Sequence, residues 1–346
     1  MTILIVASDE DSWTANAVHE SLLADGADAV RLVTEHFPLS LRMVAHCGNA
    51  GENAQLFIDG RMVDLASVSA VWHRRWRTAA TVTSLAVPDD VRQGIQRESA
   101  ASLEGVIGAL PCFHLDQPAA IARARNRPLQ LVLARQLGID IPRTLTTNSP
   151  QDALSFFDDC NGDVIVKMLS SFSVRDESGH DKVVMTNRVT SEHLRKIDTL
   201  STCPMTFQER IQKSMELRIT VVGYEIFAAS VDSGLEPMAE TDFRRGFATL
   251  SQHWKPYRLP PEFAEKLLAL MDALQMNYGA IDVIVTPDGR YVFLEDNPVG
   301  QFGWVEHATG MPIARTIAGL LTGRVPRRVD LPTVSCNLGD FARSTV

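Results

Sequence analysis

Apolar and polar positions over the first 115 residues alternate between short strand-like runs and longer helical ones. Residues 3–8 and 29–33 are apolar runs of strand length, and residues 13–23 between them carry apolar side chains at helical spacing. An Asp59-Gly60 turn between two short alternating runs predicts a hairpin over residues 55–64. Together with a strand ending at Trp72 and a long helix over 90–110, this pattern predicts a small α/β domain.

The remaining chain alternates between predicted helices and strands without an internal repeat. One continuous helix is expected over residues 117–137, stopped by Gly138, and the last two strands are joined by the turn Pro287-Asp288-Gly289. Further helices are predicted over 151–157, 262–274 and 312–321, and strands over 144–147, 164–169, 182–185, 205–209, 217–222, 225–231, 280–286 and 291–295.

Composition narrows the class of protein. The chain has 346 residues, 45% of them hydrophobic, which is enough for two or three packed units. Its net charge of -9 disfavours a nucleic-acid binder, which normally carries a basic surface. No run approaches the roughly 20 apolar residues of a membrane helix. The five cysteines are scattered with no C-x-x-C pair, so we expect free thiols and a cytoplasmic protein.

A local basic cluster, His73-Arg74-Arg75-Trp76-Arg77, stands out against the acidic chain. Arginines in such a cluster can bind a phosphate group or an acidic peptide. The alternative is a solvated basic turn without a ligand, and the sequence leaves both interpretations open.

The final predicted hairpin carries the clearest chemistry. Strict alternation places Phe293, Glu295 and Asn297 on one face of the last strand, and the tight turn brings Asp282 opposite or diagonal to Glu295. Two carboxylates and an amide oxygen suit magnesium that also contacts phosphates. The alternative is that these residues form a solvent-facing sheet edge.

Two strand-borne cations add to this signal. Lys167 lies inside an apolar run, where a lysine either reaches the surface along its aliphatic stem or meets an anion such as a nucleotide phosphate. Arg218 follows Glu216 on a predicted strand, and its planar guanidinium can bind a phosphate or a developing oxyanion. A surface ion pair between Glu216 and Arg218 is the competing interpretation.

Several catalytic signatures are missing from the sequence. It contains no G-x-x-x-x-G-K-[ST] motif of a P-loop enzyme and no G-x-G-x-x-G after its first strand. It also lacks G-x-S-x-G and zinc-type His/Cys spacing. Common nucleotide-binding, hydrolase and zinc-enzyme classes are therefore disfavoured.

The order of these features along the chain resembles the ATP-grasp superfamily over roughly residues 118–322. More narrowly it is similar to the ligases that macrocyclise ribosomal peptides of the microviridin (graspetide) type. That likeness depends on three segments: Trp72-His73-Arg74-Arg75, residues 138–147 (GIDIPRTLTT) and residues 297–304 (NPVGQFGW).

The resemblance implies an α/β fold in which a pre-ATP-grasp domain over 1–116 precedes two ATP-grasp subdomains over 117–205 and 206–325, with ATP between them and a tail over 326–346. It implies ATP and Mg²⁺ as cofactors. The implied residues are Arg127, Lys167, Gln208, Glu209, Arg210, Ile211 and Glu216 for the nucleotide, Asp282, Glu295 and Asn297 for the metal, and Arg218, Arg244 and Arg245 for catalysis.

The implied reaction phosphorylates an Asp or Glu side chain of a precursor peptide. A Ser or Thr hydroxyl or a Lys amine of the same peptide then displaces phosphate and closes an ester or amide ring. The partner is a precursor with a leader segment, and relatives lead us to expect a homodimer. Three departures from the family stand out. Arg127 replaces a common lysine, and the loop over residues 170–178 is poor in glycine where many relatives have a glycine-rich loop over the phosphates. Asp296 replaces an apolar residue and is expected to face away from the metal.

Two other functions remain open at this stage. A ligase that adds glutamate or another amino acid to an acceptor shares all the ATP chemistry and differs only in the acceptor. From a different class, a regulatory module that binds ATP without catalysis is also compatible, although the full metal set of Asp282, Glu295 and Asn297 disfavours it.

Overall fold

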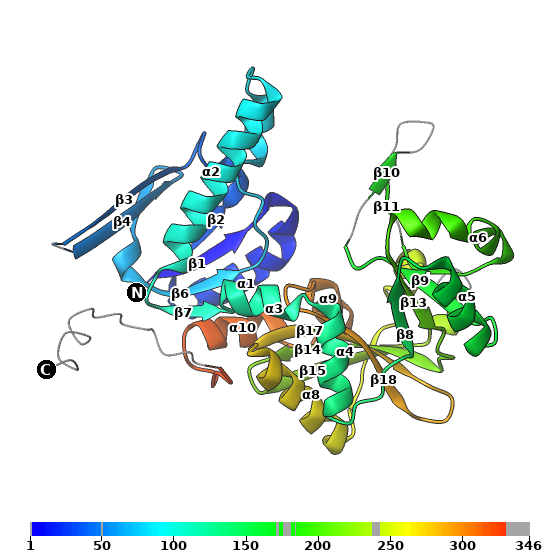
Figure 1. The fold of residues 1–346 in the computed structure, drawn as a ribbon. Helices are drawn as coiled ribbons and strands as arrows, with labels where there is room; N and C mark the ends of the chain where they lie inside the picture. The colour runs from blue at the N-terminus through cyan, green and yellow to red at the C-terminus, as the bar shows by residue number, and fades with distance from the viewer. Residues whose placement is uncertain are drawn as a thin grey trace, which may run out of the picture.

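The computed structural model describes residues 2–49, 51–170, 173–175, 181–183, 185–236 and 243–329, with side chains left undescribed at 173–175, 181–183, 233, 243, 244, 247 and 248. Three units follow one another across the molecule, with the N-terminal unit and the central unit on either side of a C-terminal unit (Figure 1). The expected α/β architecture with a small α/β domain at its start is confirmed.

The N-terminal unit is built on a parallel sheet of order β2-β1-β6-β7. Its strands are β1 (Thr2–Ala7), β2 (Asp28–Val33), β6 (Val68–His73) and β7 (Phe113–Leu115). Helix α1 (Ser12–Ala24) covers one face, and α2 (Asp89–Gly108) covers the other, where an antiparallel sheet of β3 (Arg42–Gly48), β4 (Gly51–Ile58) and β5 (Arg61–Asp64) adds to the core. The predicted hairpin is present, but β3 was not predicted because its short run alternates weakly.

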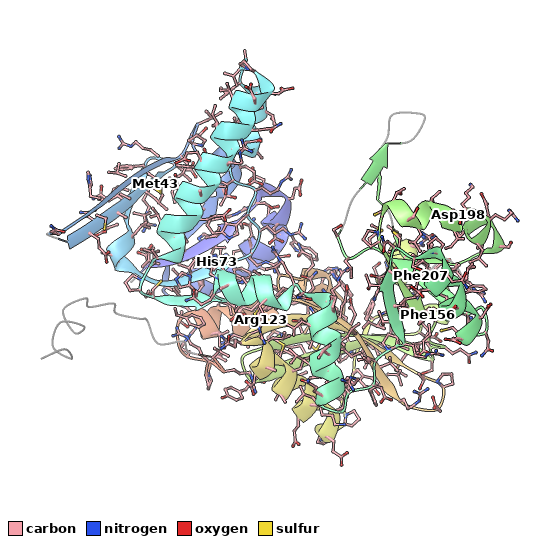
Figure 2. All side chains as sticks on the ribbon, in the orientation of Figure 1. Met43, His73, Arg123, Phe156, Asp198 and Phe207 are labelled. Atoms are coloured by element: carbon pink, nitrogen blue, oxygen red, sulfur yellow. The ribbon has the colours of Figure 1, made fainter. Side chains whose placement is uncertain are left out.

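The central unit is an antiparallel sheet of order β12-β9-β13-β8 with helices on one face. Its elements are β8 (Thr144–Thr147), α5 (Pro150–Asp159), β9 (Val164–Lys167), β12 (Asn187–Arg188), α6 (Ser191–Arg195) and β13 (Met205–Glu209), and a hairpin of β10 (Ser173–Arg175) and β11 (Asp181–Val183) projects from it. Phe156 and Phe207 lie in the core between this sheet and its helices (Figure 2). Because β13 pairs with β8 and β9, the expected boundary between residues 205 and 206 cuts a strand, and the sheet continues to Glu209.

The C-terminal unit is an antiparallel sheet of order β16-β15-β14-β17-β18. Its strands are β14 (Met215–Val222), β15 (Glu225–Val231), β16 (Lys255–Pro256), β17 (Tyr278–Val285) and β18 (Tyr291–Asn297). Helices α3 (Pro118–Ala124), α4 (Arg127–Gln136) and α8 (Pro261–Leu274) contribute to the core on one face. Helices α9 (Gly303–Thr309) and α10 (Ile313–Leu321) contribute to a second core that continues into the N-terminal unit, so these two units share apolar packing.

The remaining elements are short. They are α7 (Phe247–Leu250) and the 3-10 turns η1 (Asp9–Asp11), η2 (Thr34–His36), η3 (Leu65–Ser67), η4 (Ala80–Ser84), η5 (Ile197–Thr202), η6 (Ser233–Leu235) and η8 (Phe243–Gly246). Within the described residues, every helix is too short or too polar to cross a membrane.

The predicted continuous helix over 117–137 is wrong, because the chain breaks between α3 and α4. Asn126 has an extended backbone, and its side-chain oxygen accepts a hydrogen bond from the Leu129 amide as the cap of a new helix. Pro128 falls in the first turn of α4, where its missing amide costs nothing. Apolar periodicity alone did not separate the two helices.

Candidate active site

A cavity of about 450 Å³ opens between the central sheet and the C-terminal sheet. Such a volume is typical of sites for nucleotide-sized ligands. Lys167, Thr206 and Gln208 line it from the central sheet, Leu294 from β18, and Arg127, Leu131 and Arg135 from α4. Two of the predicted strand residues, Lys167 and Gln208, therefore reach one cavity together with Arg127.

Strand alternation explains why these side chains face the cavity. Thr206 and Lys167 are directly paired across β13 and β9, and Gln208 lies two residues further on the same face. The opposite face carries Phe207, which is buried against the helices of the central unit. The Gln208 amide donates to the Thr144 hydroxyl at 2.9 Å, so its orientation is fixed within the cavity wall. Thr206 was not predicted, although alternation from Lys167 could have identified it.

The predicted hinge residues lie at the end of β13. Glu209 accepts a hydrogen bond from the Arg143 amide at 3.1 Å, and the Arg210 side chain forms an ion pair with Asp163 at 2.7 Å. Ile211 follows and is partly buried. The Arg210 guanidinium therefore stabilises the turn before β9, and only the backbone of this segment remains a candidate for contacting a base.

Glu216 and Arg218 do not form the surface ion pair that was the competing interpretation. Both residues are buried, and each has a different partner. Lys213 contacts the Glu216 carboxylate at 2.6 Å, whereas Arg218 donates to Asp282 at 2.9 Å and to the Gln301 carbonyl at 3.0 Å. Although burial disfavours a charged guanidinium, the adjacent Asp282 carboxylate raises the pKa of Arg218 above its ordinary value.

The two predicted metal-binding carboxylates lie side by side. Asp282 and Glu295 are directly paired across β17 and β18, as the hairpin predicted. Burial raises the pKa of Asp282; the positive charge of Arg218 opposes this shift, and the negative charge of Glu295 adds to it. Glu295 forms an ion pair with Arg127 at 2.8 Å, and Arg127 also donates to the Met168 carbonyl at the end of β9. Arg127 thus joins the two sides of the cavity.

One detail of the predicted hairpin is wrong. Strict alternation placed Phe293 on the face of Glu295, but β18 has a bulge between the Phe293 and Glu295 pairings. Phe293 is fully buried in the core, and the extra residue Leu294 lines the cavity instead. Asn297 pairs with Ala280 two positions beyond Glu295, so these two side chains do share a face. The bulge is what lets Leu294 line the cavity while Glu295 still pairs with Asp282.

These residues fit a magnesium ion. Mg²⁺ usually takes one or two protein carboxylates and completes its shell with substrate phosphates and water. Asp282 and Glu295 supply two neighbouring carboxylates whose mutual repulsion a cation relieves, and Asn297 adds an amide oxygen. Among the described residues, no group of three or more His, Cys, Asp or Glu side chains gathers as a metal site.

Asp296 faces away from this group, as expected from its position between Glu295 and Asn297. It is buried, and the Ala280 backbone lies next to its carboxyl group. Burial raises the pKa of the Asp296 carboxyl to about 7. Its backbone is fixed by Gln130, whose side chain accepts from the Asp296 amide and donates to the Asp296 carbonyl.

Two of the three predicted catalytic arginines lie in a segment that the structure describes only in part. The side chain of Arg244 is outside the described residues, as is Asp242 before it. Arg245 is exposed, and its guanidinium contacts the Thr186 carbonyl at 3.0 Å and the Asn187 side chain at 2.7 Å. Of the three predicted catalytic arginines, the described structure therefore places Arg218 next to the carboxylate pair.

The basic cluster at residues 73–77 is not a solvated turn. Arg74 is fully buried, and its Nε donates to Asp11 at 2.9 Å. His73 is buried against His114, with 2.8 Å between His73 Nε2 and His114 Nδ1, and burial lowers the pKa of His73 to about 3. Arg77 is exposed and paired with Glu10. No phosphate or peptide role is needed to explain why Arg74 and His73 are present.

The cavity between two antiparallel sheets is nucleotide-sized and is lined by a lysine and an arginine. That arginine is paired with one of two neighbouring carboxylates, an arrangement typical of an ATP-grasp enzyme. Family models match the whole of this region: an MvdD pre-ATP grasp domain covers residues 2–122 and a RimK-like ATP-grasp domain covers residues 122–321. The chain therefore belongs to the ATP-grasp ligases, in the group whose ATP-grasp region follows an MvdD-type domain.

Solved structures agree with this assignment over nearly the full length. A RiPP-associated ATP-grasp ligase from Chryseobacterium gregarium, solved with ADP and a leader and core peptide, is 31% identical with a TM-score of 0.89, covering 95% of this chain and 98% of its own. The macrocyclase MdnC from Microcystis aeruginosa, bound to precursor peptide MdnA, is 38% identical with a TM-score of 0.84, covering 93% of this chain and 100% of its own.

A curated relative covers less of the chain. The ribosomal protein bS6–L-glutamate ligase of Escherichia coli is 26% identical over 208 residues, which is 59% of this chain and 66% of that ligase. The expected resemblance to microviridin-type macrocyclases is confirmed. The ATP-grasp family binds ATP with magnesium, whereas the individual roles of the site residues stay predictions.

Proposed function

We propose that this chain uses ATP to phosphorylate Asp or Glu side chains of a ribosomal precursor peptide and then closes ester or amide rings within that peptide. The observation that carries the proposal is the pairing of Asp282 with Glu295 beside the buried Arg218. Glu295 is in turn paired with Arg127, which lines the same cavity as Lys167. Similarity of 31–38% to peptide-modifying relatives over more than nine-tenths of the chain supports a peptide as the substrate.

In the proposed site, Lys167 and Arg127 bind phosphate oxygens of ATP, and the backbone after Gln208, from Glu209 through Arg210 to Ile211, contacts the adenine. Glu216 binds the ribose. Asp282, Glu295 and Asn297 hold magnesium, which supplies charge neutralisation at the transferring phosphoryl group when it is bound. Leu294 provides an apolar surface in the same cavity.

The chemistry that the chain's own residues perform is electrostatic. A peptide carboxylate attacks the γ-phosphorus of ATP and ADP leaves, which turns a poor electrophile into an acyl phosphate. A hydroxyl or amine of the same peptide then attacks the acyl carbon, and inorganic phosphate leaves. Arg218 is the buried donor next to the carboxylate pair, and we assign it to the developing oxyanion. Arg244 and Arg245 are proposed to assist it.

A glutamate-adding ligase is the second candidate, favoured by the match to the bS6-modifying enzyme. That match spans 59% of the chain, whereas the macrocyclase likeness spans 93–95%. A regulatory module without catalysis is disfavoured, because a protein that only binds ATP has no need for Arg218 beside a complete set of metal ligands.

The test is mass spectrometry of a candidate precursor, the peptide of the short reading frame next to this gene, incubated with the protein, ATP and Mg²⁺. Ring closure removes one water per ring and produces ADP. A mass gain of one glutamate instead identifies the second candidate. An unchanged peptide with no ADP, while ATP still binds, identifies the regulatory module.

We also propose a leader-bearing precursor as partner, since relatives have been solved with leader and precursor peptides. A homodimer is proposed as well, on the family resemblance alone. A precursor lacking its leader but processed at the full rate would refute the role of the leader. Sedimentation of the purified chain at the mass of one copy would refute the homodimer.

A further inference from the structure

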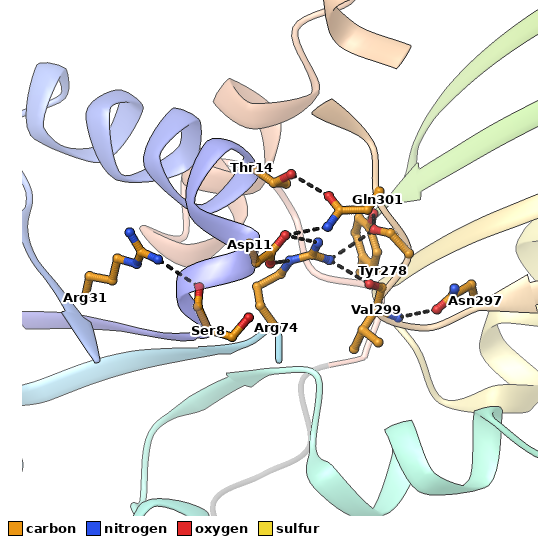
Figure 3. A network of polar contacts seen from close by, with 10 residues as sticks. Ser8, Asp11, Thr14, Arg31, Arg74, Tyr278, Asn297, Val299 and Gln301 are labelled. Carbon is orange, nitrogen blue, oxygen red and sulfur yellow. Dashed lines mark hydrogen bonds and ion pairs between the residues drawn. The ribbon is translucent and has the colours of Figure 1, made fainter. Parts of the chain in front are cut away.

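A buried ion pair connects the N-terminal unit to the chain that follows the metal ligands. Arg74 and Asp11 are both completely shielded from solvent, with Arg74 Nε 2.9 Å and Arg74 Nη2 3.3 Å from the two Asp11 oxygens (Figure 3). The other guanidinium nitrogen points to the C-terminal unit, where it donates to the carbonyls of Val299 and Gly300, each at 3.0 Å. One side chain thus fixes two consecutive peptide groups 225 and 226 residues away.

The turn over residues 299–301 is held by other contacts as well. The Tyr278 hydroxyl donates to the same Gly300 carbonyl at 2.6 Å, and Gln301 Nε2 donates to Asp11 at 2.6 Å. The Thr14 hydroxyl donates to the Gln301 side-chain oxygen. Asp11 therefore accepts from both Arg74 and Gln301, and η1 and α1 of the N-terminal unit define where the turn lies.

The turn over residues 299–301 also positions two proposed site residues. The Gln301 carbonyl accepts from Arg218 Nη2 at 3.0 Å, and the Val299 amide donates to Asn297 Oδ1 at 3.2 Å. Gly300 packs so closely that a Cβ at this position would lie 2.8 Å from Arg218 Nη2. A small displacement of the turn consequently moves both the Arg218 guanidinium and the Asn297 oxygen.

Stability alone gives little reason to keep this pair. Desolvating an arginine and an aspartate costs about as much as their attraction returns, and apolar residues of similar volume often replace such a pair without loss. Only a polar pair can donate to the Val299 and Gly300 carbonyls and accept from Gln301. These contacts thus determine the position of the turn over residues 299–301 more than they stabilise the contact between the two units.

We infer that Asp11 and Arg74 are positioning residues for the ligase reaction: through the turn over 299–301 they set Arg218 and Asn297 against the bound nucleotide and metal. The N-terminal unit is then part of the catalytic machinery and not only a neighbouring domain. This inference rests on the proposed function, since it assigns the turn to the same carboxylate and arginine site.

The test compares the wild type with the double variant Asp11→Leu/Arg74→Met, which removes the charges and retains comparable volume. Gln301→Met serves as a milder second variant that keeps the ion pair. Asp25→Asn is the matched control, because Asp25 pairs with Arg324 across the same two units without touching the turn. For each protein we measure the melting temperature and the kcat and KM for ring formation. We also measure the Mg²⁺ midpoint, which is the Mg²⁺ concentration that gives half of the maximal thermal stabilisation by ADP.

We expect the double variant to fold with a near-native melting temperature while kcat falls about 10- to 100-fold, because small misplacements of reacting groups have effects of that size. The Mg²⁺ midpoint rises several-fold, KM for the peptide changes little, and Asp25→Asn behaves as wild type. Gln301→Met shows the same pattern at smaller amplitude, with faster hydrogen exchange over residues 297–303.

A double variant with native kcat and native Mg²⁺ midpoint would overturn the positioning role. If the double variant does not fold, Gln301→Met decides: native values for kcat, the Mg²⁺ midpoint and exchange refute the inference. If the wild type itself forms no rings, the proposed function fails, and the Mg²⁺ midpoint with ADP still tests the positioning role because it needs no peptide.

Discussion

Replacing Arg218 by glutamine removes the only cation in contact with Asp282 in the described structure. Arg218 and Asp282 lie 2.9 Å apart, and their side chains are 8% and 21% exposed, respectively. Asp282 is then left next to Glu295, its direct neighbour across the strands, without a compensating charge. The variant is therefore expected to lose stability as well as activity.

The size of this loss follows from the burial of the pair. Removing one partner of a buried ion pair typically costs about 3–5 kcal/mol, and the partial exposure of Asp282 points to the lower end, about 3 kcal/mol. A change of 1 kcal/mol shifts the melting temperature of a medium-sized domain by about 2–4 °C, so a fall of about 6–12 °C is expected. The double variant Arg218→Gln/Asp282→Asn removes the unpaired charge and should recover most of that loss.

The assay is thermal unfolding of wild type, Arg218→Gln, Asp282→Asn and the double variant without nucleotide, together with ring formation by each. We predict that the double variant regains stability but remains inactive, because both the proposed oxyanion donor and a proposed metal ligand are gone. A single Arg218→Gln variant as stable as wild type would show that the pair carries no such energy. Restored ring formation in the double variant would remove Arg218 from the catalytic site.

Three further predictions follow from the same contacts. Lys167→Ala should raise the Kd for ATP about 10- to 100-fold, because that is the effect of losing one hydrogen bond to a charged group. A calorimetric titration measures this Kd, and an unchanged value would place the phosphates elsewhere. Gly300→Ala should lower kcat with little change in peptide KM, because the new methyl group meets Ala280 and Arg218, whereas Gly289→Ala, in open space at a positive φ, should affect stability only. His73→Phe should make the free energy of unfolding less dependent on pH between 3 and 6.5. Burial lowers the pKa of His73 to about 3, so below pH 6.5 the unfolded chain binds more protons than the folded chain. Wild-type stability therefore falls by up to about 1.4 kcal/mol per pH unit as the pH drops from 6.5 toward 3. Urea unfolding at several pH values measures that slope, and an equal slope in both proteins would contradict the assignment.

The histidine pair itself is consistent with neutral rings. The Leu110 carbonyl can only accept, so His114 Nε2 carries a proton and donates to it. His114 Nδ1 is then the acceptor for the His73 Nε2 proton, which leaves His73 Nδ1 as a buried acceptor without a partner. Protonating either ring adds a charge in a site where burial penalises it.

Local patterns predicted much of the fold and the centre of the site. Alternation and turn chemistry placed Asp282 opposite Glu295, and the apolar run around Lys167 indicated a strand that reaches a ligand cavity. These predictions succeeded because the relevant neighbours lie within one hairpin or one strand, where spacing determines geometry.

What the sequence could not provide depends on distant or subtle contacts. The bulge that moves Phe293 into the core and Leu294 into the cavity breaks strict alternation without any glycine or proline to mark it. The partners of Arg74 are distant in sequence: Asp11 is 63 residues away, and Val299 and Gly300 are 225 and 226 residues away, so the basic cluster looked like a surface feature. Only the assembled fold shows that the N-terminal unit contacts the turn after the metal ligands.

The central claim is that a peptide carboxylate is activated as an acyl phosphate and captured within the same peptide. The most direct measurement uses a precursor whose Asp and Glu carboxylates carry ¹⁸O, incubated with the protein, ATP and Mg²⁺, with mass analysis of both peptide and phosphate. The account predicts that each ring closed releases one phosphate bearing a single ¹⁸O atom from the activated carboxylate. Unlabelled phosphate together with an unchanged peptide, or label transferred to AMP, would contradict it.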